Sequence, residues 1–165
     1  MLIACATIPR FELVAAAGER SELMARPVAL APEPGGVQIV GDISGAAGAF
    51  GVERGMRVAE ALARCPTLSL IPPDPQRATE RWEQALLKLE AIGAAVEPVP
   101  GVRGEVFFGL AGLRAVLGSP ERSLEQARAA LGGPARLGAG PTRLCALAAA
   151  TRTRPRRRAV IVQGR

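Results

Sequence analysis

Short apolar runs alternate with segments of helical periodicity along most of the chain. Three runs predict strands, and they are "LIACAT" (2–7), "LSLI" (68–71) and "EVFFGL" (105–110). The clearest helix covers residues 75–93, because apolar residues recur on one face and a glycine at the end is a candidate C-cap. On that face lie Ala78, Trp82, Ala85, Leu86 and Leu89, and we expect Trp82 to be a core anchor.

The remaining pattern predicts shorter elements. Helices are expected over residues 9–23, 56–66, 111–118, 119–133 and 141–153, with Pro9 in a first turn and Ser119 as an N-cap. Strands are expected over residues 27–31, 37–41, 94–99, 135–140 and 159–164, with "PEPGG" as a turn between the first two. A glycine-rich loop is expected over residues 41–56. Since hairpins are mixed with crossovers, this order favours an α+β fold.

Composition narrows the class of protein. Of the 165 residues, 48% are hydrophobic, which argues against a disordered chain. No apolar run approaches the roughly 18 residues of a membrane span, and the N-terminus lacks the basic start of a signal peptide, so we expect a cytoplasmic chain. The absence of histidine excludes Ser-His-Asp triads and most transition-metal sites. The absence of tyrosine, with only 3% aromatic residues, argues against a stacking platform for single-stranded nucleic acid.

The three cysteines, Cys5, Cys65 and Cys145, are expected to be small buried hydrophobic residues. Their odd number and wide spacing argue against a disulfide framework and against a zinc site. Cys5 lies in an apolar strand and Cys145 on an apolar helix face, so neither is expected to be reactive.

The positive charge has two possible explanations. The net charge is +6, and of the 21 basic residues only Lys88 is a lysine, which is typical of the codon bias of a high-GC genome. The charge is also uneven, because residues 152–158 hold five arginines, which suits a phosphate backbone or an acidic partner surface. The candidate contacts for DNA or a partner are therefore Arg152, Arg154, Arg156, Arg157 and Arg158.

Four segments in this order resemble the N-terminal part of the Y-family, or translesion, DNA polymerases. They are "ARPVAL" (25–30), "AFGVERGMRVAEALARCPTLSLIPPDPQR" (49–77), "VEPVPGVRGEVFFGLAGL" (96–113) and "LGAGPTRLCALAAATRTRP" (137–155). The resemblance implies a ferredoxin-like palm sheet backed by helices over residues 1–10 and 66–165, with a small fingers-like insertion over residues 11–65. The thumb and little finger of the family are expected to be absent.

The resemblance also implies positions for the catalytic groups. The family's metal-binding acids fall at Thr7 and Gly104, and only the glutamate of its Asp-Glu pair is retained, as Glu105. Nucleotidyl transfer by two magnesium ions needs several carboxylates, so no metal and no cofactor are expected here. The groups that hold the triphosphate and screen the sugar fall at Gly45, Gly48, Leu147 and Glu12, which we interpret as vestigial positions.

This pattern is closest to the catalytically inactive, ImuB-like members of the family. The resemblance implies that the chain is not an enzyme but an adaptor in damage-induced translesion synthesis and mutagenesis. Its implied partners are an error-prone C-family DNA polymerase and a RecA-like protein, whereas no clear motif for the sliding clamp is present. Two alternatives stay open, namely a basic DNA-binding module and a fragment of a longer translesion DNA polymerase.

Overall fold

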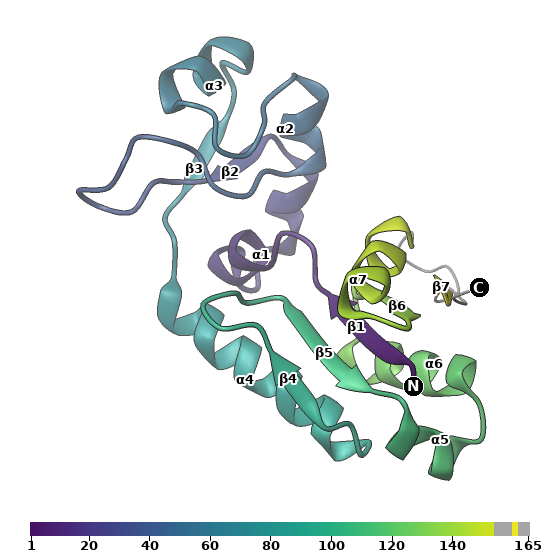
Figure 1. Cartoon of the computed structure of the whole chain (residues 1–165). Helices are drawn as coiled ribbons and strands as arrows, with labels where there is room; N and C mark the ends of the chain where they lie inside the picture. The colour runs from purple at the N-terminus through teal and green to yellow at the C-terminus, as the bar shows by residue number, and fades with distance from the viewer. Residues whose placement is uncertain (154–159, 162–165) are drawn as a thin grey trace. The chain divides into compact units, whose positions relative to one another are not determined.

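The structure, a computed structural model, describes residues 1–153 and 160–161 (Figure 1). The chain forms two compact units. The first, called the sheet unit, consists of Met1–Pro9 and Trp82–Arg165, and the second, called the insert unit, consists of Arg10–Arg81. The palm-like and fingers-like parts implied by the sequence were bounded at residues 10/11 and 65/66, and that division into palm and fingers stays a prediction.

The sheet unit contains a five-stranded sheet in the order β4-β5-β1-β6-β7. Its strands are β1 (Ile3–Thr7), β4 (Val96–Pro98), β5 (Glu105–Gly109), β6 (Arg136–Gly140) and β7 (Val160–Ile161). The first four strands in the sheet pair antiparallel, and β7 pairs parallel with β6. With helix α4 between β1 and β4 and helices α5 and α6 between β5 and β6, this is the expected ferredoxin-like α+β arrangement.

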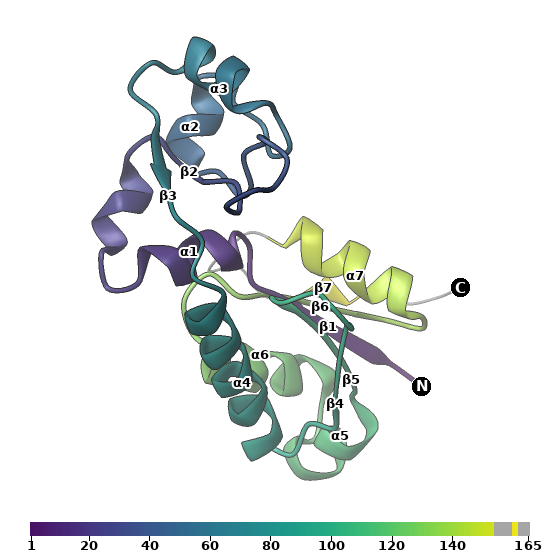
Figure 2. The same ribbon diagram turned by 90° about the vertical axis from the view of Figure 1, so that its left-hand side faces the viewer.

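Helices lie on both sides of this sheet. Figure 2 shows α6 (Pro120–Leu131) and the end of α4 (Pro75–Ala91) on one side and α7 (Arg143–Arg152) on the other, while the short α5 (Ala111–Leu117) precedes α6. Because both faces are covered, the central residues of β1 and β5 are buried in succession. This explains why both strands have continuous apolar runs.

The insert unit is built around a small parallel pair of strands. Strand β2 (Val28–Leu30) pairs with β3 (Ser69–Ile71), so a crossover of nearly forty residues joins them. The helices of this unit are α1 (Phe11–Ala17), the 3₁₀ turn η1 (Ser21–Ala25), α2 (Gly45–Ala49) and α3 (Val58–Arg64). Its main core cluster consists of Ala29, Val40, Ala47, Val52, Ala61, Cys65 and Leu68.

Three local predictions in the insert unit are wrong. Residues 27–31 and 37–41 do not form the predicted hairpin, because Val40 exchanges backbone hydrogen bonds with Gly55 and Met56, and Leu30 instead bonds to Gly41 and Asp42 at the far end of the segment. The predicted helix 9–23 ends at Gly18, whose positive φ of 63° stops α1. The predicted loop 41–56 contains α2, since the Ser44 hydroxyl caps a helix that the glycine content had concealed.

The predictions for the sheet unit are confirmed more closely. Trp82 is 8% exposed, which makes it a core residue, and Gly93 ends α4 with a φ of 93°. Ser119 caps α6. Of the last predicted strand, 159–164, the structure describes only β7. None of the helices in the described ranges is long and apolar enough to cross a membrane.

Candidate functional site

The structure brings Thr7 and Glu105 together on one face of the sheet. Thr7 pairs with Glu105 on β5 and with Arg136 on β6, so the three residues form a row across three strands. Residues directly opposite in antiparallel strands have side chains on the same face, and here that is the face covered by α7. The sequence did not single out Arg136, because its place in the row depends on a strand pairing about 130 residues apart.

Gly104 shapes the backbone just before this row. Its φ is 86°, a conformation that side chains other than glycine rarely adopt, and its carbonyl accepts the amide of Ile8 at 2.8 Å. The glycine therefore lets the turn close onto the end of β1. This local requirement is sufficient to explain a glycine at the position where the resemblance placed an aspartate.

The carboxylate of Glu105 affects the neighbouring thiol. Burial, and secondly the negative charge of Glu105, raise the pKa of Cys5 to about 12. The thiol is therefore protonated near neutral pH and is a poor nucleophile, as expected from the apolar strand. All three cysteines are free thiols, and Cys5 and Cys65 are buried as expected. The expectation of burial is wrong for Cys145, which is only partly buried.

Arg136 places a cation beside Thr7. One of its terminal nitrogens donates to the carbonyl of Thr151 at 3.5 Å, in the last turn of α7, where a positive charge is favoured by the helix dipole. Its Nε is buried and has no hydrogen-bond partner among the described residues. The row therefore combines a carboxylate, a hydroxyl and a guanidinium.

This combination does not fit a pair of magnesium ions, which prefer several carboxylate oxygens. Among residues 1–153 and 160–161, no group of three or more His, Cys, Asp or Glu side chains is placed to hold a metal ion.

The remaining predicted positions fall in both units. Leu147 packs against the cluster of Cys5, Phe107, Ala146 and Ala150, on the same face of the sheet as the Thr7 row. In the insert unit, Gly45 and Gly48 lie on α2 and Glu12 lies in the first turn of α1.

Arg10, which the sequence did not single out, lies close to Gly45. Its guanidinium lies 3.9 Å from the place that a Cβ of Gly45 would take. Arg10 also has a φ of 56°, and no other non-glycine residue in the described ranges has a positive φ. The first residue of the insert unit is therefore held in a backbone conformation that costs free energy.

Of the five predicted basic contacts, the structure describes only Arg152. Arg152 is the last residue of α7 and is exposed. Arg154, Arg156, Arg157 and Arg158 lie outside the described residues. At the other end of α7, Arg143 lies over the ring of Phe107, 5.4 Å from its centroid, and forms an ion pair with Glu97.

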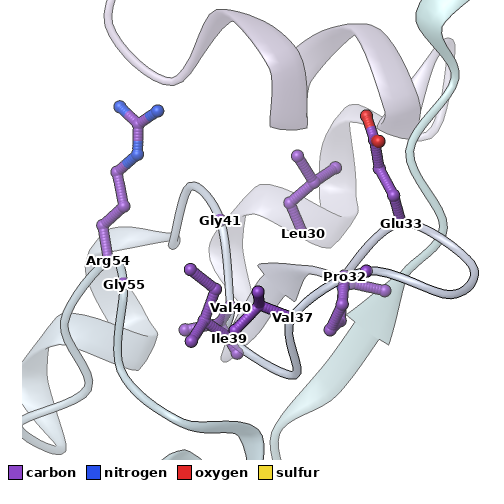
Figure 3. Close-up of a pocket in the computed structure, with 11 residues that line it drawn as sticks. Leu30, Pro32, Glu33, Val37, Ile39, Val40, Gly41, Arg54 and Gly55 are labelled. Atoms are coloured by element: carbon purple, nitrogen blue, oxygen red, sulfur yellow. The ribbon is translucent and has the colours of Figure 1, made fainter.

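The insert unit also contains a groove that the sequence did not reveal (Figure 3). The groove has a volume of about 350 Å³. Its lining consists of Leu30, Ala31, Pro32, Glu33, Gly36, Val37, Ile39, Val40, Gly41, Arg54 and Gly55. Most of these are aliphatic, and the two charged residues come from different segments of the chain.

Comparison with known proteins relates this fold to a family. The model of the impB/mucB/samB family matches residues 8–151. The chain belongs to the impB/mucB/samB family. The matched range begins at the end of β1, includes the whole insert unit and ends within α7, so both units are part of the family's domain.

Solved Y-family DNA polymerases share the fold of this impB/mucB/samB chain at low sequence identity. A Y-family DNA polymerase chimera of Dbh and Dpo4 matches 99% of the chain with a TM-score of 0.80 and 16% identity. An insertion ternary complex of Dbh DNA polymerase matches 98% of it with a TM-score of 0.81 and 16% identity. DinB from Sulfolobus solfataricus matches 99% with a TM-score of 0.73 and 15% identity. The predicted resemblance to Y-family polymerases is confirmed, while the ImuB-like subtype stays a prediction.

The chain spans about half the length of these structures, 49% of the chimera and 48% of the other two. No curated protein sequence matches the chain.

These matches correct the expectation that the protein is not an enzyme. That expectation rested on ligands missing at aligned positions, whereas the structures with this fold are named as DNA polymerases. At 15–16% identity the backbone is shared while individual side chains differ, so single aligned positions do not decide activity. The Thr7 row contains a single carboxylate, that of Glu105. This does not establish that the protein lacks activity.

Proposed function

We propose that this chain is a polymerase-fold module of translesion synthesis that serves as an adaptor for other proteins of that process. The observation that carries the proposal is the family match over residues 8–151, supported by the polymerase fold at TM-scores of 0.80 and 0.81. By the ImuB-like resemblance, the partners are an error-prone C-family DNA polymerase and a RecA-like protein.

The adaptor role is supported by the surface of the insert unit. Val37, Ile39, Phe50 and Leu62 are large hydrophobic residues there that are 38–75% exposed. Val37 and Ile39 also line the groove, and exposed apolar side chains in a groove are typical of surfaces that bind a partner.

The test has a cellular and a biochemical part. Deletion of the gene is expected to lower the frequency of mutations induced by ultraviolet light, and the complete protein expressed from a plasmid restores it. In vitro, the immobilised chain is expected to bind the purified C-family polymerase or RecA-like protein of the same cell in biolayer interferometry. Unchanged induced mutagenesis in the deletion strain, together with no binding of either protein, would refute the proposal.

A second candidate function is that the chain is part of a longer translesion DNA polymerase. The observation that favours it is the 48–49% coverage of structures named as DNA polymerases. The test is magnesium-dependent primer extension across an abasic template site by the complete protein. Incorporation that is lost in Glu105→Ala supports this candidate, and incorporation equal in both proteins argues that the Thr7 row takes no part.

A further inference from the structure

We propose that the groove of the insert unit binds a short extended segment of a partner protein. The segment has aliphatic side chains in its middle, an acidic residue toward Arg54 and a basic residue toward Glu33. This inference deepens the adaptor role and rests on it, because it assigns the surface that receives a partner.

The floor of the groove is aliphatic and open to solvent. Val37 is 75% exposed and Ile39 is 39% exposed, and both lie beside Leu30 and Val40 (Figure 3). Large hydrophobic side chains left in water can gain free energy by burial, about 25 cal/mol for each Å² covered. The floor therefore favours an occupant with aliphatic side chains.

The floor is also held in place before anything binds. The amide of Gly41 donates a hydrogen bond of 2.9 Å to the carbonyl of Leu30. The amide of Val40 donates to the carbonyl of Met56, and the carbonyl of Val40 accepts from the amide of Gly55, both at 2.9 Å. A Cβ on Gly41 would lie 3.0 Å from a terminal methyl of Leu30, so the glycine lets that side chain lie across the floor. A preformed site loses less entropy on binding than a loose one.

The two charges lie at opposite ends of the groove and point the same way (Figure 3). Arg54 is 75% exposed and contacts Asp42 at 3.5 Å, and the carboxylate of Asp42 also accepts the amide of Leu13 at 3.3 Å. Asp42 thus orients Arg54, whose five N–H donors allow it to bind a second carboxylate as well. Glu33 at the other end is exposed and complements a basic residue.

The same lining disfavours nucleic acid as the occupant. No aromatic residue is among the eleven that form the groove, so unpaired bases find no stacking partner. The single cation is balanced by Glu33 and Asp42, so a phosphate backbone would meet no excess of positive charge. A protein segment with one charge of each sign is the better complement.

The direct test uses two fluorescein-labelled synthetic peptides with the complete chain. Each peptide has four aliphatic residues between an aspartate and a lysine, and the two differ in which charge comes first. We expect one order to bind more tightly in fluorescence anisotropy. Val37→Ala is expected to weaken that binding about tenfold, because two buried methyl groups are lost.

Matched controls distinguish binding in this groove from non-specific hydrophobic binding of the peptides. Val116→Ala removes the same methyl groups from a valine that is 80% exposed in the sheet unit, and it is expected to leave binding unchanged. The double variant Glu33→Lys with Arg54→Glu is expected to reverse the preference between the two peptides. That reversal is an effect that a merely destabilised protein would not produce.

Several results would overturn the inference. The first is that neither peptide binds with a dissociation constant below about 1 mM. The second is that Val37→Ala and Val116→Ala weaken peptide binding equally. The third is that the double variant does not reverse the preference between the two peptides. It is also overturned when the groove variants weaken binding of a primer–template DNA duplex and leave peptide binding intact. The adaptor role fails separately if the wild-type chain binds neither translesion protein. If those proteins bind Val37→Ala as tightly as the wild type, the adaptor role stands and only the groove inference fails.

Discussion

Gly138→Ala is expected to destabilise the sheet unit, because helix α7 lies directly on that glycine. A Cβ at residue 138 would lie 2.2 Å from the backbone nitrogen of Ala150 and 2.5 Å from the carbonyl carbon of Ala149. Ordinary van der Waals contact begins at 3.4 Å, so the helix must retreat by about 1.2 Å (3.4 − 2.2) at this point. Backbone atoms cannot avoid the clash by changing rotamer.

The retreat lifts Ala146 and Ala150 away from Cys5 and Phe107, which form one buried cluster. Overpacking of this kind costs about 3 kcal/mol, at the upper end of the usual range since a helix rather than a side chain must move. For a chain of this size, that loss lowers the melting temperature by about 6–12 °C.

The matched control is Gly109→Ala on β5, another strand of the same sheet. A Cβ there would meet nothing within 4 Å, so this variant is expected to be neutral or slightly stabilising. Urea unfolding followed by tryptophan fluorescence measures both, because Trp82 is the chain's single tryptophan and lies in the sheet unit. The packing argument is refuted when the two variants unfold at the same urea concentration.

The thiols, the buried hydroxyl of Ser44 and the basic run give further expected outcomes. In folded protein at pH 8, a maleimide is expected to label Cys145, which is partly exposed, and to spare the buried Cys5. The pKa of the Cys5 thiol is raised from 9.0 to about 12 in the folded protein, so the free energy of unfolding is expected to fall as the pH rises above 9. In thermal melts at increasing pH, this decline is expected to be shallower in Cys5→Ala. Ser44→Ala is expected to cost the insert unit about 2–4 kcal/mol, since the fully buried hydroxyl makes three hydrogen bonds to backbone groups, and amide hydrogen exchange of that unit measures the loss. If the five arginines of residues 152–158 contact a DNA backbone, the logarithm of the binding constant falls with the logarithm of salt concentration with a slope of about −4, and a flat titration rejects that contact.

The Thr7 row illustrates why the site was only partly visible in the sequence. The resemblance placed Thr7 and Glu105 at the family's catalytic positions, and the register of β1 and β5 places the two residues opposite each other. Arg136 belongs to the same row only because β6 pairs with the other edge of β1. An arginine at the start of a short strand carries no signal of that neighbour, so a sequence reading finds the carboxylate and misses the cation.

The insert unit gives a second illustration. An apolar alternation over residues 37–41 after a turn is typical of a hairpin, yet Gln38 and Val40 exchange backbone hydrogen bonds with residues 55–58, and only Gly41 at the end of the segment bonds to β2. Strand β2 then pairs parallel with β3 across a long crossover. The groove exists because of these distant pairings, since they place Arg54 and Gly55 next to the segment that holds Glu33 and Val37.

Features that depend on neighbours within a few residues were predictable from the amino-acid sequence alone. The apolar face of α4 and its end at Gly93, the cap of α6 at Ser119 and the buried strands β1 and β5 all follow from periodicity and capping. Which strands pair, which side chains share a row and where the groove opens became apparent only in the folded chain. Those outcomes depend on burial and on closing loops of tens to more than a hundred residues. The balance between packing and chain entropy cannot be inferred from any local segment of the sequence.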